Sequence, residues 1–443
     1  MRLFLFLFCS ASLFGEVKGD WPRWRGPFDN GVARGDAPLT WSDTENISWK
    51  IKVPGKGNSS PVIWEDKIFV TSAVRLGAAP AAAAPPRRGF GQGESGEQPE
   101  HQLTLLCYDR NSGKLLWERV AKTVKPSEGY HQRYGSFASN SPVTDGKRVY
   151  AFFGSNGAYA YDLNGKQLWS WESGVKMRMR NAFGEGVAPT LHEDTLLLLF
   201  DHEGDDDFLQ ALDAVTGKPK WRTKRSEVSN WAAPLVIERA GSKQVIVSAP
   251  TKVLAYDIKD GSAIWEVSGL GLNTIPAPVH SDGTLIVMSG FREPNLLAIK
   301  LGRKGDLTGT DSIVWTTTRG TSYTPSPVLH EGKLYMLTDS GMLSCLDAVT
   351  GKPWYERTRL PKPYNFKSSP VLVKDRLYLS SEDSDVIVVK AGEQFEVLAT
   401  NTLADQSFIA TPAVSGGSLY LRSETHLFCI RDSAAKVNSR RTN

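Results

Sequence analysis

The side chains best suited to covalent chemistry in this chain are its cysteines, and their spacing argues against such a role. Cys107, Cys345 and Cys429 stand at one position of a repeated pattern, in LLCYD, LSCLD and LFCIR. Other copies of the pattern carry alanine there, as at Ala160 and Ala211. A disulfide needs two Cα atoms within about 7 Å, and equivalent positions of separate repeats should lie farther apart. We therefore predict three free, buried thiols without a catalytic role.

Histidines and acidic residues could bind a metal ion, but the repeat distributes them as well. His192, His280 and His330 are expected at the first turn of three different repeats, so they should be spread out rather than clustered. The segment DHEGDDD at 201–207 has alternating acids that could hold Ca²⁺, yet it lacks the spacing of an EF-hand loop. We predict a solvated hairpin turn there. Because no G-x-S-x-G, H-E-x-x-H, P-loop or Cys-x-x-Cys motif occurs, the sequence predicts no catalytic residue and no metal site.

Two segments that mix arginine, methionine and aromatic residues are the best candidates for a binding surface. They are KPSEGYHQRYGSFASN at 125–140 and ESGVKMRMRNAFGEG at 172–186. Such residues suit contact with a protein or with an anionic small molecule; solvated loops are the alternative. Together with residues of later connections, the predicted ligand or partner contacts are Tyr130, His131, Arg133, Arg178, Arg180, Asn181, Trp231, Asn273 and Tyr323.

A repeat must position these segments, and its landmark is a proline followed by a hydrophobic or small residue. Eight copies occur, at Pro61, Pro142, Pro189, Pro234, Pro278, Pro327, Pro370 and Pro412. After a first spacing of 81 residues, the others lie between 42 and 49, which is typical of the blades of a β-propeller. Each unit contains four short apolar runs separated by turns. We therefore predict an all-β fold of eight four-stranded antiparallel blades, with the connections between blades crowded on one binding face.

The long first spacing contains an Ala, Pro and Gly-rich stretch at 75–101. Such a composition has little to bury, so we predict a disordered insertion within the first blade; a docking role for it is an alternative. The propeller itself is expected to span residues 46–432, between an N-terminal extension at 20–45 and a tail at 433–443.

The octapeptide LDAVTGKP occurs twice, at 212–219 and 346–353, and is predicted to form the third turn of a blade, with Gly217 and Gly351 at positive φ. In several units a tryptophan follows the glycine by four residues. A buried indole supplies a large apolar surface and one N–H donor, which suits a repeated contact between blades. The predicted structural tryptophans are Trp49, Trp117, Trp169, Trp221, Trp265 and Trp315.

The last unit has three strands and lacks the fourth. The segment NISWKIKVP at 46–54 has a strand composition and precedes the first unit. Pairing it with the last unit would close the ring and remove the exposed sheet edges. We predict this closure.

The [LY]-D-x-x-[TN]-G-K-x-x-W unit resembles the PQQ-like β-propeller repeat of quinoprotein dehydrogenases and of BamB-type assembly proteins, and the lead-in WPRWRGPFDNGVA at 21–33 is similar to exported proteins with such repeats. The BamB branch implies an eight-bladed scaffold that binds a protein through loops on one face. The quinoprotein branch implies PQQ with Ca²⁺ and oxidation of alcohols or sugars, but this chain lacks the adjacent cysteines of those enzymes. The leading hypothesis is a non-catalytic scaffold; the alternative is a PQQ-dependent dehydrogenase.

Composition and the first residues indicate where the protein works. With 52 basic and 48 acidic residues the net charge is +4, too weak to indicate a nucleic-acid partner. Residues 1–19 resemble a signal peptide, and Phe8 before Cys9 does not fit a lipidation site. No later run reaches the ~20 apolar residues of a membrane span. We predict an exported monomer, in the periplasm or cell envelope or secreted.

Overall fold

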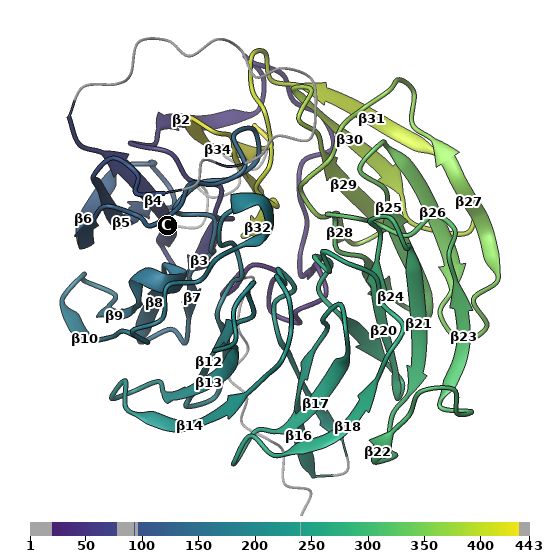
Figure 1. The fold of residues 1–443 in the computed structure, drawn as a ribbon. Coiled ribbons are helices and arrows are strands. Elements are labelled where there is room, and N and C mark those ends of the chain that lie inside the picture. Colours follow the sequence, from purple (N-terminus) through teal and green to yellow (C-terminus); the bar gives the residue numbers. More distant parts are fainter. Residues whose placement is uncertain (1–19, 78–92, 94–95, 240, 434–443) are drawn as a thin grey trace, which may run out of the picture.

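The computed structural model describes residues 20–77, 93, 96–239 and 241–433. The predicted signal peptide, most of the insertion at 75–101 and nearly all of the predicted tail lie outside these residues. The described chain forms eight antiparallel sheets arranged around an axis (Figure 1). Its helices are two short 3-10 segments, η1 (Gly154–Asn156) and η2 (Arg180–Ala182). The prediction of an all-β, eight-bladed propeller is confirmed.

The blades follow the chain in order, each running from an inner to an outer strand. Blade 1 comprises β3 (Val62–Trp64), β4 (Lys67–Arg75), β5 (His101–Asp109) and β6 (Leu115–Val124), and blade 2 comprises β7 (Val143–Thr144), β8 (Arg148–Phe152), β9 (Ala158–Asp162) and β10 (Gln167–Trp171). Blade 3 comprises β11 (Thr190–His192), β12 (Thr195–Phe200), β13 (Phe208–Asp213) and β14 (Pro219–Lys224). Blade 4 comprises β15 (Leu235–Arg239), β16 (Ser242–Val247), β17 (Val253–Asp257) and β18 (Ala263–Val267). Blade 5 comprises β19 (Val279–Ser281), β20 (Thr284–Ser289), β21 (Asn295–Lys300) and β23 (Ile313–Thr317), and blade 6 comprises β24 (Val328–His330), β25 (Lys333–Leu337), β26 (Met342–Asp347) and β27 (Pro353–Arg359). Blade 7 comprises β28 (Val371–Val373), β29 (Arg376–Ser380), β30 (Asp385–Lys390) and β31 (Val397–Thr402). Blade 8 comprises β32 (Ala413–Ser415), β33 (Ser418–Arg422), β34 (His426–Arg431) and β2 (Ile47–Lys52).

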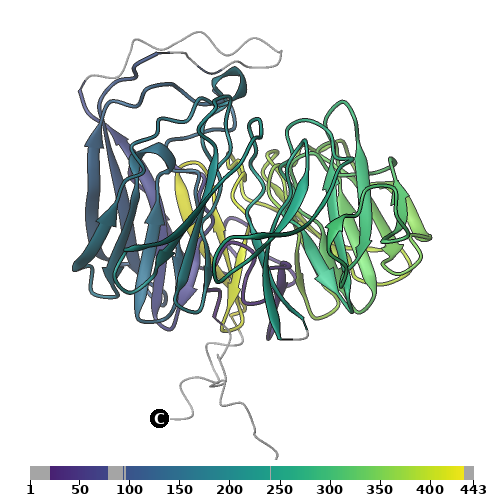
Figure 2. The same cartoon turned by 60° about the horizontal axis from the view of Figure 1, so that its bottom comes forward.

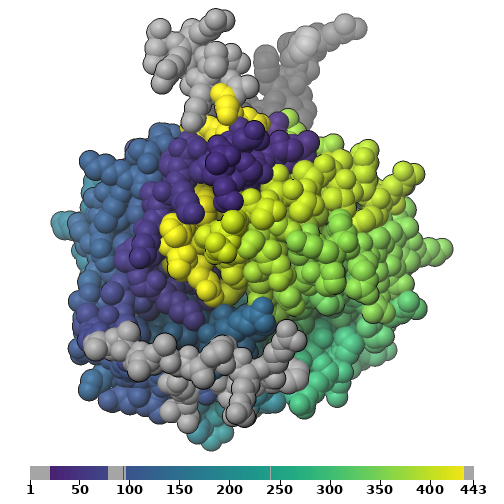
Figure 3. Space-filling model, turned by 90° about the horizontal axis from the view of Figure 1, so that it is seen from above, coloured from purple at the N-terminus to yellow at the C-terminus, as the bar shows by residue number. Residues whose placement is uncertain are grey.

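The N-terminal strand closes the ring, as the sequence predicts. β2 pairs antiparallel with β34, with Trp49 opposite Cys429, so the last blade takes its outer strand from the front of the chain. The purple N-terminal segment accordingly lies beside the yellow C-terminal strands (Figures 1 and 3). The two ends of the repeat are therefore held together by one ladder of hydrogen bonds, and the outer edge of β34 is paired.

Two blades carry a fifth strand that the repeat does not predict. β1 (Val32–Ala33) pairs parallel with β28 of blade 7. β22 (Gly305–Asp306) pairs parallel with β18 of blade 4, and it lies in a long third turn of blade 5, between β21 and β23. Both additions come from segments that break the regular pattern of turns.

Five of the six predicted structural tryptophans donate their indole N–H to a backbone carbonyl of the following blade. The acceptors are Arg110 for Trp49, Leu163 for Trp117, Ala214 for Trp169, Ile258 for Trp221 and Ala348 for Trp315, at 2.8–3.1 Å. Trp265 differs, because the third turn of blade 5 is enlarged, and its N–H donates to Gln244 of its own blade at 3.0 Å. These contacts lock neighbouring blades together.

The glycine of the octapeptide is needed for the tryptophan contact between blades as well as for the turn. Gly217 has φ 72°, and a Cβ added to it would lie 2.6 Å from the Trp169 ring. Gly351 has φ 71° and stands in the same relation to Trp315. The turn therefore needs glycine both for its backbone conformation and because the tryptophan of the preceding blade occupies the space of a side chain.

A second set of links between blades surrounds the axis at the residue before each landmark proline. The backbone N–H of that residue donates to the hydroxyl of its counterpart in the next blade, at 2.8–3.1 Å, for Ala277 to Ser326, Ser326 to Ser369, Ser369 to Thr411, Thr411 to Ser60 and Ser60 to Ser141. Alanine occupies this position at 188, 233 and 277 and offers no hydroxyl. The hydroxyl chain therefore covers blades 6 to 8, 1 and 2.

Replacing Ser369 with alanine should lower the free energy of unfolding by about 0.5–1.5 kcal/mol, because the buried N–H of Ser326 loses its acceptor. Ala188→Ser should have the opposite effect, since it offers a hydroxyl to the N–H of Ser141. Guanidinium denaturation of both variants measures this. If Ser369→Ala matched the unmodified protein, the hydroxyl chain would contribute nothing to stability.

Cys107, Cys345 and Cys429 are free and buried, as predicted; that they have no catalytic role stays a prediction. Burial raises the pKa of the Cys107 and Cys345 thiols to about 12, which disfavours the thiolate at neutral pH.

Candidate functional site

The axis of the ring contains a cavity of about 1480 Å³. It is lined by the connections that lead from the outer strand of one blade to the inner strand of the next, and by the second turns of blades 6 and 7. η2 belongs to one of these connections and projects at the top of the molecule in Figure 2. The cavity is therefore built by the loop-rich face that the sequence predicts for binding.

The first residues of the described chain contact the inner ends of several blades. Residues 20–31, which we call the strap, lie low in the ring in Figure 2. Trp21 pairs with Ile63 of blade 1, while the buried Arg25 donates to the carbonyls of Pro327 and Pro370 in blades 6 and 7, at 2.7 and 3.1 Å. Trp24 lines the cavity. The strap thus links the inner end of blade 1 to the inner ends of blades 6 and 7, and Trp24 is its contribution to the cavity lining.

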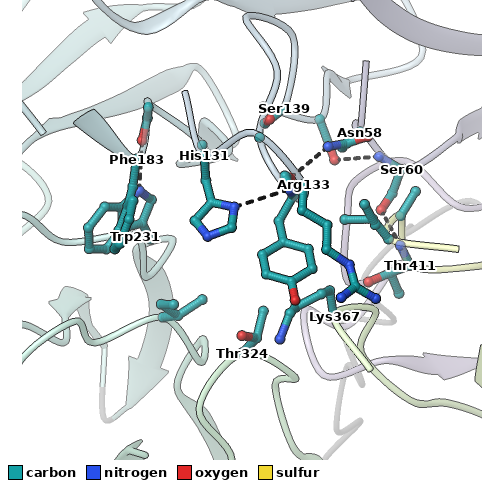
Figure 4. A pocket seen from close by; sticks show the side chains of 18 of the residues that line it. Asn58, Ser60, His131, Arg133, Ser139, Phe183, Trp231, Thr324, Lys367 and Thr411 are labelled. Atoms are coloured by element: carbon teal, nitrogen blue, oxygen red, sulfur yellow. Dashed lines mark hydrogen bonds between the residues drawn. The ribbon is translucent and has the colours of Figure 1, made fainter. Parts of the chain in front are cut away.

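Aromatic side chains line one side of the cavity. Tyr134 stacks on His131 with ring centroids 4.6 Å apart, His131 lies 5.1 Å from Phe183, and Phe183 lies 6.5 Å from Trp231. All four residues line the cavity, and Figure 4 shows Trp231, Phe183 and His131 in one row. We call these four residues the aromatic wall. Three successive connections supply it, so the packing of neighbouring blades assembles it.

Polar and charged side chains line the side formed by blades 6 and 7. Lys367 pairs with Asp339 at 2.5 Å and places its ammonium 4.5 Å from the centre of the Tyr134 ring. Thr324 donates to Asp339 through both its N–H and its hydroxyl, at 2.9 and 2.8 Å. Burial alone would lower the pKa of Lys367, but the Asp339 carboxylate outweighs it and raises that pKa above the ordinary value. Lys367 therefore stays charged inside an ion pair.

The connection from blade 1 to blade 2 reaches across the mouth of the cavity. Arg133 pairs with Glu382 of blade 7 at 2.9 Å, although the Glu382 side chain is only 2% exposed and that of Arg133 is 55% exposed. Asn58 fixes the base of the same connection by donating to the carbonyl of Tyr134 at 2.7 Å. Residues 130–135 consequently contact loops of non-adjacent blades.

The structure places the predicted contact residues in two groups. His131, Arg133, Trp231 and Tyr323 line the cavity. Asn273 lies behind Tyr323 and donates to its hydroxyl at 3.3 Å. Their role in binding stays a prediction.

The other four predicted residues lie on the rim rather than inside. Tyr130 packs on Phe137 at 4.7 Å. Arg178 and Arg180 are held by Glu203, through its carbonyl and its carboxylate respectively. Asn181 is exposed with φ 53°.

Sequence reasoning missed several cavity residues, above all Trp24, Phe183, Asp339 and Lys367. Lys367 lies in the connection before Pro370, and Asp339 lies in the second turn of blade 6. Both positions belong to the face that the repeat assigns to binding, so extending the search to every such loop would have found them.

The acidic segment at 201–207 forms the turn between β12 and β13, but the prediction of a solvated turn is wrong for its ends. Asp201 is fully buried and forms a two-pronged ion pair with the equally buried Arg225, at 2.6 and 2.9 Å. Asp207 is also buried and accepts the N–H groups of His202 and Glu227. These carboxylates anchor the following connection at the rim of the cavity.

Glu185 is an unusual acid of the cavity wall. Both of its carboxylate oxygens accept hydrogen bonds from Ser155, at 2.6 and 2.5 Å, yet burial raises its pKa to about 7. A carboxyl group whose pKa is raised on folding favours the folded state while it is protonated. That stability is lost as the pH rises through about 7.

Glu185→Gln should therefore be more stable than the unmodified protein at pH 8, by about 1–3 kcal/mol, and nearly equal to it at pH 5. Denaturation at both pH values measures the difference. A constant difference would show that Glu185 is ionised throughout this range.

The quinoprotein alternative requires groups that hold PQQ and Ca²⁺. The carboxylates of PQQ need cations, but Lys367 and Arg133 already pair with Asp339 and Glu382. Within the described ranges, no three His, Cys, Asp or Glu side chains group in a way that could hold a metal ion. The residues present do not fit this pair of cofactors.

Comparisons with known proteins give a consistent result. The family model described as outer membrane protein assembly factor BamB matches residues 101–271 and 303–421. The outer membrane protein assembly factor BamB of Moranella endobia (strain PCIT) is 26% identical over 291 residues, which cover 62% of this chain and 67% of that protein. The unmatched residues between the two ranges contain most of blade 5, the blade with the enlarged third turn.

Solved structures share the fold. BamB from Moraxella catarrhalis has a TM-score of 0.54 at 13% identity, covering 81% of this chain and 98% of its own. The quinohemoprotein alcohol dehydrogenase from Comamonas testosteroni has a TM-score of 0.61 at 11% identity, covering 94% and 81%. The part of the chain that the structure describes has no helix that is long and apolar enough to cross a membrane.

Proposed function

This chain belongs to the BamB family of PQQ-like β-propellers, and from that premise we propose that it is an exported, non-catalytic scaffold that binds a protein partner on its loop-rich face. The supporting observation is the arrangement of that face. Connections from several blades present exposed polar side chains around one cavity, among them Gln132, Arg133 and Asn181. Such loops, carried on a rigid ring, are suited to recognition.

Site-specific photo-crosslinking in the native cells tests this proposal. A photoreactive residue at Gln132 or Asn181 should capture a specific protein, because both are exposed on the loop-rich face. Val349 is the matched control: it is 70% exposed but lies in a third turn, on the opposite face. Equal capture from Val349, or none from either loop position, would contradict the proposal. Fractionation of the same cells tests export.

The second candidate function is a PQQ-dependent dehydrogenase, which the shared fold with the quinohemoprotein alcohol dehydrogenase favours. The donor set of the cavity does not support it. Titration of the purified protein with PQQ and Ca²⁺, followed by absorbance and by oxidation of alcohols or sugars, decides between the two. Saturable binding with turnover would replace the scaffold proposal.

A further inference from the structure

We propose that the axial cavity is a binding site for a neutral oligosaccharide. The inference rests on the proposed function only in that the loop-rich face is the side from which ligands enter. It adds a second kind of ligand, held inside the ring rather than on its rim.

The aromatic wall supplies the first half of a sugar site. The C–H groups on one face of a sugar ring carry a slight positive charge and pack against the electron-rich face of an aromatic ring. Trp231 donates its indole N–H to the carbonyl of Gly184 at 2.9 Å, so its polar atom is satisfied by the protein. Phe183 and Trp231 therefore present aromatic surface to the cavity, whereas the Tyr134 ring is covered by His131 and by the Lys367 ammonium.

This wall carries no net charge at neutral pH. His131 is its only residue that titrates near pH 7, and burial, together with the nearby cations Lys367 and Arg133, lowers its pKa below the ordinary value. A neutral imidazole at this position adds no positive charge of its own for an anion to pair with.

Blades 6 and 7 supply hydrogen-bonding groups in pairs. Lys367 donates one N–H to Asp339, which leaves two N–H donors beside the carboxylate. The Thr324 hydroxyl donates to Asp339 and can still accept a hydrogen bond. Asp383 lines the cavity next to Asn365, whose backbone N–H donates to it at 2.7 Å. Adjacent donors and acceptors match the neighbouring hydroxyls of a sugar, each of which both donates and accepts.

Charge balance separates this class from anionic ligands. The cations of the cavity, Lys367 and Arg133, are each paired with a carboxylate. An anion that took the place of either carboxylate would leave it unpaired, and at the buried Glu382 this is unfavourable. A neutral polyol can add hydrogen bonds without breaking either pair.

Size and shape favour a chain over a single sugar. The volume of about 1480 Å³ exceeds the ~300–1,000 Å³ of most small-molecule pockets. Because the connections between blades line the cavity, a saccharide would enter from the loop-rich face.

Isothermal titration calorimetry with a panel of neutral hexasaccharides of glucose, xylose and N-acetylglucosamine tests the proposal, with hexagalacturonate as the charged comparison. At least one neutral chain should bind, and its affinity should change by less than about twofold between low and high salt, because no counterions are released.

Trp231→Ala should weaken the affinity for this saccharide at least about tenfold. Trp354→Ala, which removes a partly exposed tryptophan of β27 outside the cavity, should leave it unchanged. Trp231→Phe keeps an aromatic face and should lose an intermediate amount of affinity. This variant keeps the test decisive if the alanine variant misfolds.

Three results would overturn the inference: no neutral chain binds, hexagalacturonate binds better with a strong salt dependence, or the two alanine variants lose affinity equally. Crosslinking at Gln132 keeps the two proposals distinct. Capture of a protein without any saccharide binding would leave the proposed function standing and remove this inference; saccharide binding without a captured protein would do the reverse.

Discussion

Arg225→Met is expected to lower the free energy of unfolding by about 3–5 kcal/mol, because it leaves buried carboxylates without their cation. Arg225 is fully buried, pairs with Asp201 and lies 3.9 Å from Glu227. Burial alone would lower its pKa, but these carboxylates outweigh it and hold the pKa above the ordinary value. Guanidinium denaturation measures the loss.

The loss should also depend on pH. Burial raises the pKa of Glu227 and Arg225 opposes that rise, so without Arg225 the variant should recover stability as the pH falls and Glu227 is protonated. The double variant Arg225→Met with Asp201→Leu should be more stable than the single one, since fewer buried charges remain unpaired.

A surface ion pair provides the control for this prediction. Arg303 pairs with Asp311, and their side chains are 54% and 75% exposed, so Arg303→Met should cost about 0–1 kcal/mol. A loss at Arg225 no larger than that would show that the buried pair does not anchor the connection after blade 3.

Trp21→Ala is expected to lower the free energy of unfolding by about 3–5 kcal/mol, the range for removal of a large buried aromatic side chain. Trp21 is 0% exposed and exchanges two backbone hydrogen bonds with Ile63, at 3.1 and 2.8 Å. A Cβ on Gly26 would lie 2.7 Å from its ring. Trp21 thus fixes the beginning of the strap to blade 1.

Hydrogen exchange shows whether the strap itself is released. In Trp21→Ala, amides of residues 20–31 should exchange faster than those of β3 to β34, because the strap loses the packing of its buried indole while the ring keeps β2. Trp354→Ala should change stability by less than about 1 kcal/mol, since this side chain is 36% exposed. Unchanged exchange in the strap would show that Arg25 and the later contacts hold it without Trp21.

Much of the fold follows from the sequence because each blade is a local unit. The landmark prolines give the period, and the glycine and tryptophan of the third turn recur at fixed spacing. The three-stranded last unit also predicts the closure by β2, since an unpaired strand edge requires a partner. What the repeat pattern does not predict is found where the pattern is broken, in the strap and in the enlarged turn that holds β22.

The residue before each landmark proline shows a signal that sequence reasoning overlooked. Ser60, Ser141, Ser326, Ser369 and Thr411 carry hydroxyls at one repeat position. A polar side chain conserved through the repeat beside buried residues requires a partner, and in the ring that partner is the next blade. The sequence therefore indicates that these hydroxyls need hydrogen-bond partners, and the structure shows that the partners belong to the neighbouring blade.

The sequence by itself determined the eight-bladed ring, its closure and the face that carries the connections, because each depends on local periodicity and turn chemistry. Only the tertiary structure decided which side chains meet at the axis. Trp231 and Lys367 are 136 positions apart in the chain, and Trp24 belongs to a strap outside the repeat. The position of each in the cavity depends on the angle between blades and on where the strap crosses the ring. Those are properties of the closed ring, and no single repeat contains them.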